Sequence, residues 1–238
     1  MQSPLDSSIK IKAYAVHLLT AAGIVPAALA MFELTAVDCD PRFVFVWLFI
    51  TTLIDAVDGP LARRYHVKAN AASIDGRTID DLLDYLTFAF VPLLLIWRMD
   101  WLPFGFGWTT ILAMMASLFG FAHAEAKDES GGFFRGFPSY WNIFAFYAGI
   151  ISTMFSPWLT AILLWTLTVL TVCPIRLIYP NLAPQPWRTW LLGGAFAWAI
   201  IMLIMLKPFP MVGVVLLSVS LIYPLAYIAA SFHLSRKG

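Results

Sequence analysis

Apolar runs long enough to cross a lipid bilayer follow one another along almost the whole chain. The hydrocarbon core of a membrane takes about 20 helical residues to span. Polar residues, Pro and Gly separate the runs, which fall at about 11–36, 41–62, 78–99, 103–124, 139–155, 157–180, 187–206 and 209–233. The pattern predicts an all-α fold, a polytopic integral membrane bundle of about eight transmembrane helices.

Composition supports a membrane protein and argues against several other classes. Of 238 residues, 61% are hydrophobic and 12% are charged, whereas soluble domains carry about 25% charged residues. The net charge of +1 offers no polyanion-binding surface, so we expect no nucleic-acid partner. Cys39 and Cys173 are too few and too far apart for a disulfide framework or a cysteine metal site. We expect a single membrane domain over residues 1–238.

Basic residues predict the orientation of the helices, because Lys and Arg concentrate on the cytoplasmic side of membrane proteins. With the N-terminus inside, twelve of the 15 Lys and Arg residues fall on the inner side. Only Arg42, Arg98 and Lys207 fall outside. Both termini are therefore expected in the cytoplasm.

Acidic residues concentrate where the second run ends and the third begins. The chain has 15 basic and 14 acidic residues, and ten of these 29 lie between Asp55 and Asp84. Asp55 and Asp58 end the second run, while Asp80 and Asp84 open the third. Each ionised Asp at membrane depth costs about 2.5–3.5 kcal/mol. Four of them require compensation.

Helical spacing indicates what that compensation is. Residues three or four apart share a helix face, so each Asp pair projects from one face. The short connecting loop makes the two helices antiparallel neighbours, which directs both pairs toward one point near the cytoplasmic surface. Hard ions such as Mg²⁺ or Mn²⁺ prefer such an all-oxygen ligand set.

A simpler interpretation stays open, in which these Asp residues cap helices or pair with Arg63, Arg64 and Arg77. Asp81 points about 100° away from the Asp80 face and is expected to be a supporting residue. Asp75 is expected in the loop or as a helix cap.

These residues form a motif that resembles a known signature. The string Asp55-x-x-Asp58-Gly59-x-x-Ala62-Arg63, followed by Gly76-x-x-x-Asp80-x-x-x-Asp84, resembles that of the CDP-alcohol phosphotransferases. The resemblance implies a six-helix membrane core, here about 11–180, with two additional spans at about 187–233. It implies an active site open to the cytoplasm and two divalent metal ions, Mn²⁺ or Mg²⁺. Their ligands would be Asp55, Asp58, Asp80 and Asp84, with Asp84 also the catalytic base.

Other motif residues are candidates for binding the CDP moiety and its phosphates. Gly59 lets a nucleotide approach the helix backbone, and the small side chain of Ala62 leaves space on the same helix face. The planar guanidinium of Arg63 can donate two parallel hydrogen bonds to a phosphate. Gly76 belongs to the same signature. The loop from Arg63 to Gly76 is longer than in the commonest form of the family, and Pro60 is expected to kink the helix.

Two residues outside the motif are further candidates for contacting the nucleotide or a lipid phosphate. His17 lies in the first span with Thr20 one turn later, and Arg176 lies near the inner end of the sixth. Helix packing for His17 and positive-inside anchoring for Arg176 stay open as alternatives.

The acceptor alcohol is predicted from a narrower resemblance. Eight spans, the string DGPLARR and the later string GFPSYWN most resemble the bacterial phosphatidylcholine synthases of this family. That implies CDP-diacylglycerol as donor, choline as acceptor, CMP as product and a bacterial inner-membrane location. Choline is bound through aromatic faces and carboxylates, and the candidates are Glu125, Tyr140 and Trp141.

Three alternatives remain at this point. In the first, the reaction is the same but the acceptor is serine, inositol or glycerol phosphate instead of choline. The net negative charge of the fourth inner loop favours a cationic alcohol over these. A divalent-cation transporter would also explain paired membrane Asp residues. The last two spans would form a homodimer surface or complete the bundle.

Overall fold

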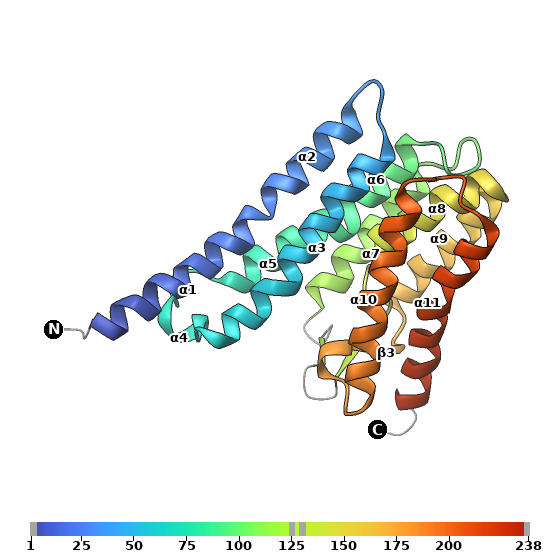
Figure 1. Ribbon diagram of the computed structural model, residues 1–238. Coiled ribbons are helices and arrows are strands. Elements are labelled where there is room, and N and C mark those ends of the chain that lie inside the picture. The colour runs from blue at the N-terminus through green and yellow to red at the C-terminus, as the bar shows by residue number, and fades with distance from the viewer. Residues whose placement is uncertain (1–3, 124–126, 129–131, 236–238) are drawn as a thin grey trace. The chain divides into compact units, whose positions relative to one another are not determined.

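The structure is a computed structural model that describes residues 4–123, 127–128 and 132–235 (Figure 1). Four of the described helical segments are long and apolar enough to cross a membrane: Ser7–Thr35, Pro41–Arg64, Trp187–Leu206 and Val214–Ser235. Three shorter apolar helices and one composite helical stretch, over residues 76–98, occupy the other predicted runs. The predicted all-α membrane bundle is confirmed.

The chain forms two compact units, residues 1–95 and 96–238. The first unit consists of α1 (Pro4–Ala22), α2 (Ile24–Thr35), α3 (Pro41–Arg64), α4 (Val67–Asn70), α5 (Gly76–Asp84), a π-helical segment η1 (Tyr85–Phe90) and most of α6 (Val91–Arg98). Helix α1 packs against both α3 and α5, and α2 packs along α3. Helix α1 is therefore the common neighbour of the two helices that carry the acidic motif.

Local sequence explains where these helices begin and end. Asp40 caps α3 by accepting a hydrogen bond from the Arg42 N–H at 2.9 Å, and Pro41 stands in the first turn, where its missing N–H costs nothing. Helix α3 continues through Pro60 to Arg64. The first predicted run is divided at Gly23, where a Cβ atom would lie 3.0 Å from the Thr20 carbonyl oxygen.

The second unit contains the remaining helices and a small sheet. Its helices are α7 (Thr109–Ala122), α8 (Trp141–Met154), α9 (Pro157–Val172), α10 (Trp187–Leu206) and α11 (Val214–Ser235), with a short 3₁₀ turn, η2 (Pro180–Leu182). Within this unit α9 packs against α7 and α8, and α10 packs against α11.

Three short strands form an antiparallel sheet that the sequence pattern did not predict. They are β1 (Lys127–Asp128), β2 (Phe133–Arg135) and β3 (Arg176–Ile178), in the order β1-β2-β3. The predicted helix over 157–180 is therefore wrong beyond Val172, and Arg176 lies exposed in β3 rather than at the end of a span. Pro174 explains the early end, because proline drives the preceding residue into extended backbone, and Cys173 has φ −76° and ψ 144°.

Helix α11 forms hydrogen bonds with β3, one of the two edge strands of this sheet. The Ser231 hydroxyl accepts a hydrogen bond from the Ile178 N–H at 3.1 Å, and the Tyr227 hydroxyl donates to the Ile178 carbonyl at 2.8 Å. Ile178 is buried in a cluster with Ala183 and Leu191. The last span thus satisfies backbone groups that an edge strand otherwise leaves open.

Candidate active site

The four aspartates of the motif line one hollow in the first unit. Asp55 and Asp58 stand one turn apart on α3, and Asp80 and Asp84 stand one turn apart on α5. Asp75 caps α5 by accepting hydrogen bonds from the Arg77 N–H at 3.1 Å and the Thr78 hydroxyl at 2.8 Å. That cap fixes where α5 begins, and the helical repeat then places both aspartates on one face.

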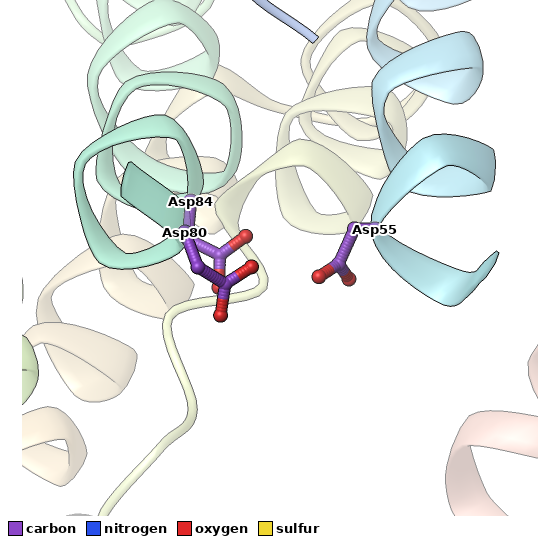
Figure 2. Close-up of side chains that lie close together, drawn as sticks. All are labelled: Asp55, Asp80 and Asp84. Carbon is purple, nitrogen blue, oxygen red and sulfur yellow. The ribbon is translucent and has the colours of Figure 1, made fainter. Parts of the chain in front are cut away.

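Three carboxylates converge across the two helices. Asp55, Asp80 and Asp84 each offer an oxygen, and these oxygens lie within 4.8 Å of one another. In Figure 2, Asp80 and Asp84 lie together on α5 and Asp55 points toward them from α3. Three ionised carboxylates at such distances repel one another. The donor set suits a hard divalent cation, which binds carboxylate oxygens.

Asp58 adds a second observation that supports a cation site. Its side chain is only 6% exposed, and its Oδ2 atom has no hydrogen-bond partner among the described residues. The Thr20 hydroxyl, on α1, lies beside the carboxyl group. Buried polar atoms are normally satisfied, and Asp58 lines the same hollow as the three converging carboxylates, so its unpartnered oxygen is compatible with a ligand role. Asp58 is not, however, one of the three residues whose oxygens lie within 4.8 Å of one another.

The walls of the hollow include residues that sequence reasoning missed. They are Gly23, Thr51, Ile54, Leu83 and Thr87. Thr51 precedes Asp55 by one turn, and Thr87 follows Asp84 by three residues, so a search along the same helix faces would have found both. The π-helical turn η1, which begins directly after Asp84, has no such signal. Turns of this kind are frequent at functional sites.

Comparison with known proteins addresses the family of the chain. The family model described as CDP-alcohol phosphatidyltransferase matches residues 13–173. The chain belongs to this family. It is accordingly a transferase and a multi-pass membrane enzyme, which favours catalysis over the divalent-cation transporter alternative.

Several curated proteins that resemble the chain are phosphatidylcholine synthases. The chain is 35% identical to a phosphatidylcholine synthase of Pseudomonas aeruginosa, over 72% of this chain and 70% of that protein. It is 31% identical to a phosphatidylcholine synthase of Legionella bozemanae, over 87% of this chain and 98% of that protein. It is 33% identical to one from Bradyrhizobium diazoefficiens, over 80% of this chain and 70% of that protein. The predicted resemblance to bacterial phosphatidylcholine synthases is confirmed.

Two glycines of the family signature have different surroundings. A Cβ on Gly59 would meet, among the described residues, only the Arg63 guanidinium at 3.7 Å, which leaves room for a ligand. A Cβ on Gly76 would lie 2.5 Å from Cε1 of His17. The space beside Gly76 is therefore occupied by a side chain of α1.

Two other signature residues lie on the last turns of α3. Ala62 packs beside a buried cluster that α1 forms with Val67 and Ala71, so its small size also serves helix packing. Arg63 is exposed at the end of α3.

The remaining acidic residues of the motif region have structural partners. Asp81 pairs with Arg77 one turn earlier, with 3.4 Å between Oδ2 and Nε. The Thr78 hydroxyl, together with backbone N–H groups, holds the pKa of Asp75 below its usual value. Both observations agree with the supporting and capping roles expected from the sequence.

The residues predicted to bind choline belong to the second unit or lie outside the described residues. Glu125 is outside them. Tyr140 is partly buried and its ring meets Phe134 edge to face at 6.4 Å. Trp141 is fully buried, and its indole N–H donates to the Ser117 hydroxyl at 2.7 Å.

Proposed function

We propose that this enzyme transfers the phosphatidyl group of CDP-diacylglycerol to choline, forming phosphatidylcholine and CMP. The observation that carries the proposal is the convergence of Asp55, Asp80 and Asp84 within 4.8 Å, beside the buried carboxyl of Asp58. A donor with two phosphates needs such a site, because charge must be balanced on the attacked phosphorus and on the departing nucleotide. The phosphatidylcholine synthases among its relatives support the choice of substrates.

The four motif aspartates would hold one or two divalent ions, Mn²⁺ or Mg²⁺. When bound, such ions neutralise phosphate charge and stabilise the leaving group. Asp55 and Asp58 approach from α3, whereas Asp80 and Asp84 approach from α5, so a ligand between the helices is held from two sides. Thr20 completes the wall next to Asp58.

Asp84 is the proposed base. The hydroxyl oxygen of choline forms a bond to the phosphorus that carries diacylglycerol, while the bond from that phosphorus to the CMP oxygen breaks. The hydroxyl proton passes to a carboxylate oxygen of Asp84. CMP leaves with the electrons of the broken bond.

The donor would be oriented by the end of α3. Gly59 leaves space for close approach of the nucleotide, and Arg63 offers two parallel N–H donors to a phosphate. Arg176 is a further proposed contact for the nucleotide or lipid phosphate. For His17 we propose the helix-packing alternative instead, because its side chain is only 6% exposed. Arg176 is available at the surface of β3.

Choline would be recognised by aromatic faces and carboxylates, because its quaternary nitrogen has no hydrogen to donate. Glu125 and Tyr140 are the proposed contacts. Trp141 is proposed to act through its position next to Tyr140, since its own ring is packed against Phe137 and Phe144. This positioning role replaces the earlier prediction that the ring of Trp141 itself contacts choline.

The enzyme is proposed to lie in the bacterial inner membrane with both termini and the active site in the cytoplasm. Twelve of the 15 Lys and Arg residues support this orientation. Residues 11–180 would form the catalytic core and residues 187–233 two additional spans.

The test is CMP release by purified protein given CDP-diacylglycerol, Mn²⁺ and one alcohol at a time. Choline, serine, inositol and glycerol 3-phosphate form the panel. The proposal predicts release with choline, and release that depends on Asp84. Release with serine but not choline would reassign the acceptor, and no release with any alcohol would refute the proposed reaction.

A further inference from the structure

His17 is a buried residue of α1 that lies against the first residue of α5. It is 6% exposed. A Cβ built on Gly76 would lie 2.5 Å from its Cε1 atom and 2.8 Å from its Nδ1 atom. Ordinary contacts between carbon atoms are about 3.5–4.0 Å, so the ring fills the space that a side chain at position 76 would take.

A second contact joins α1 to the segment before α5. The Tyr14 hydroxyl, one turn before His17, is 2.8 Å from the Ser73 hydroxyl in the loop that leads into α5. Ala13 and Val16 are buried with Val67 and Ala71. Helix α1 therefore holds the segment before α5 along its length, from α4 to Gly76.

The ring of His17 is buried and lies edge-on to the Tyr14 ring, with 6.5 Å between the ring centroids. Its Nε2 atom is buried and has no hydrogen-bond partner among the described residues. Burying a nitrogen atom without a hydrogen-bond partner costs free energy. The contribution of His17 at this position is therefore the volume of its ring, and not a hydrogen bond from Nε2. Gly76 precedes Asp80 by four residues, and Asp80 precedes Asp84 by four. A shift at Gly76 is therefore carried along one rigid helix face to both carboxylates.

We propose that His17 is a positioning residue that sets the place of α5, and through it the approach of Asp80 and Asp84 to Asp55. Gly76 is then small because the imidazole ring stands over it. This inference rests on the proposed metal-binding role of the aspartates, but it does not depend on the identity of the alcohol.

The test compares Gly76→Ala, His17→Ala and the double variant. Mn²⁺ affinity is measured on purified protein, without lipid substrate, from electron paramagnetic resonance of free Mn²⁺. Residues that orient metal ligands typically change affinity by about 10- to 100-fold. We therefore expect Gly76→Ala to weaken Mn²⁺ binding at least about tenfold, and His17→Ala, which leaves a gap rather than a clash, to weaken it less. The double variant should recover most of the affinity lost in Gly76→Ala, because the methyl group takes part of the space that the ring leaves.

Gly59→Ala is the matched control, because its Cβ does not meet His17. We expect that adding His17→Ala to Gly59→Ala restores none of the Mn²⁺ affinity that Gly59→Ala loses. A double variant of Gly76 and His17 that binds Mn²⁺ as weakly as Gly76→Ala would overturn the inference. Full affinity in Gly76→Ala alone would overturn it too.

Folding of the variants is monitored by gel filtration and circular dichroism. If Gly76→Ala does not fold, recovery of folded protein in the double variant is the supporting result, and failure of the double variant to fold is the contrary one. Failure of the choline assay leaves the Mn²⁺ comparison intact, so the two proposals fail independently.

Discussion

Replacing Asp55 by Asn removes one charge from the three carboxylates that meet between α3 and α5. Their oxygens lie within 4.8 Å of one another. At that distance, with an effective dielectric constant of about 20 for partly buried groups, each ionised pair repels by about 3.5 kcal/mol. Asp55 takes part in two of the three pairs, so the substitution relieves up to about 7 kcal/mol of repulsion in metal-free protein. Protonation of one carboxyl group would reduce that figure.

The sign of the stability change should therefore depend on metal. In chelator, we expect Asp55→Asn to unfold at a higher temperature than the wild type. Mn²⁺ at 100 times the wild-type Kd should stabilise the wild type by about 2.7 kcal/mol, and it should stabilise the variant by less. The variant lacks one ligand and gains less.

The assay is thermal unfolding of both proteins in detergent, in chelator and across an Mn²⁺ titration. Asp81→Asn is the matched control, because it removes the same charge from α5 but Asp81 pairs with Arg77. Its effect should not change with Mn²⁺. If Asp55→Asn lowered the unfolding temperature equally in chelator and in Mn²⁺, the carboxylates would not share a site.

Three further substitutions test other parts of the structure. Asp75→Ala should lower the unfolding temperature at pH 7, because the depressed pKa of Asp75 marks a carboxylate stabilised by folding. That difference should fade as the pH falls below about 3.9, the ordinary pKa of Asp, and a pH-independent difference would contradict the capping role. Trp141→Phe removes one of two donors to the Ser117 hydroxyl, the other being the Ser139 hydroxyl, and should cost about 0.5–1.5 kcal/mol in chemical denaturation; no loss would mean that the buried bond is not needed. Ser231→Ala leaves the Ile178 N–H without its acceptor, so hydrogen exchange at Ile178 should accelerate, and unchanged exchange would refute anchoring of β3 by α11.

The helical runs could be predicted because each membrane-spanning segment is a local property of the sequence. The first run is confirmed as one apolar helical segment, Ser7–Thr35, but the prediction failed where a proline interrupts a later run. Pro174 ends the helix before Arg176. The small sheet could not be predicted, because β2 and β3 are short and pair across the whole of α8 and α9.

Much of the candidate site could be predicted because the helical repeat alone puts Asp55 with Asp58 and Asp80 with Asp84. The contact of His17 with Gly76 depends on how α1 packs against α5, and no spacing within one helix reveals it. Gly76 was expected, as part of the signature, to bind the CDP moiety or its phosphates, yet its near neighbour among the described residues is an imidazole ring. Trp141 shows a similar limit, because an aromatic residue near a span end has the same sequence signal whether it is exposed or buried.

The central claim is that the aspartate cluster transfers a phosphatidyl group to choline. The most direct measurement incubates purified protein with CDP-diacylglycerol, labelled choline and Mn²⁺, and follows CMP and labelled lipid together. We predict equal amounts of CMP and phosphatidylcholine from the wild type, and neither product from Asp84→Asn. CMP formed without labelled lipid, or phosphatidylcholine formed at the wild-type rate by Asp84→Asn, would contradict the account.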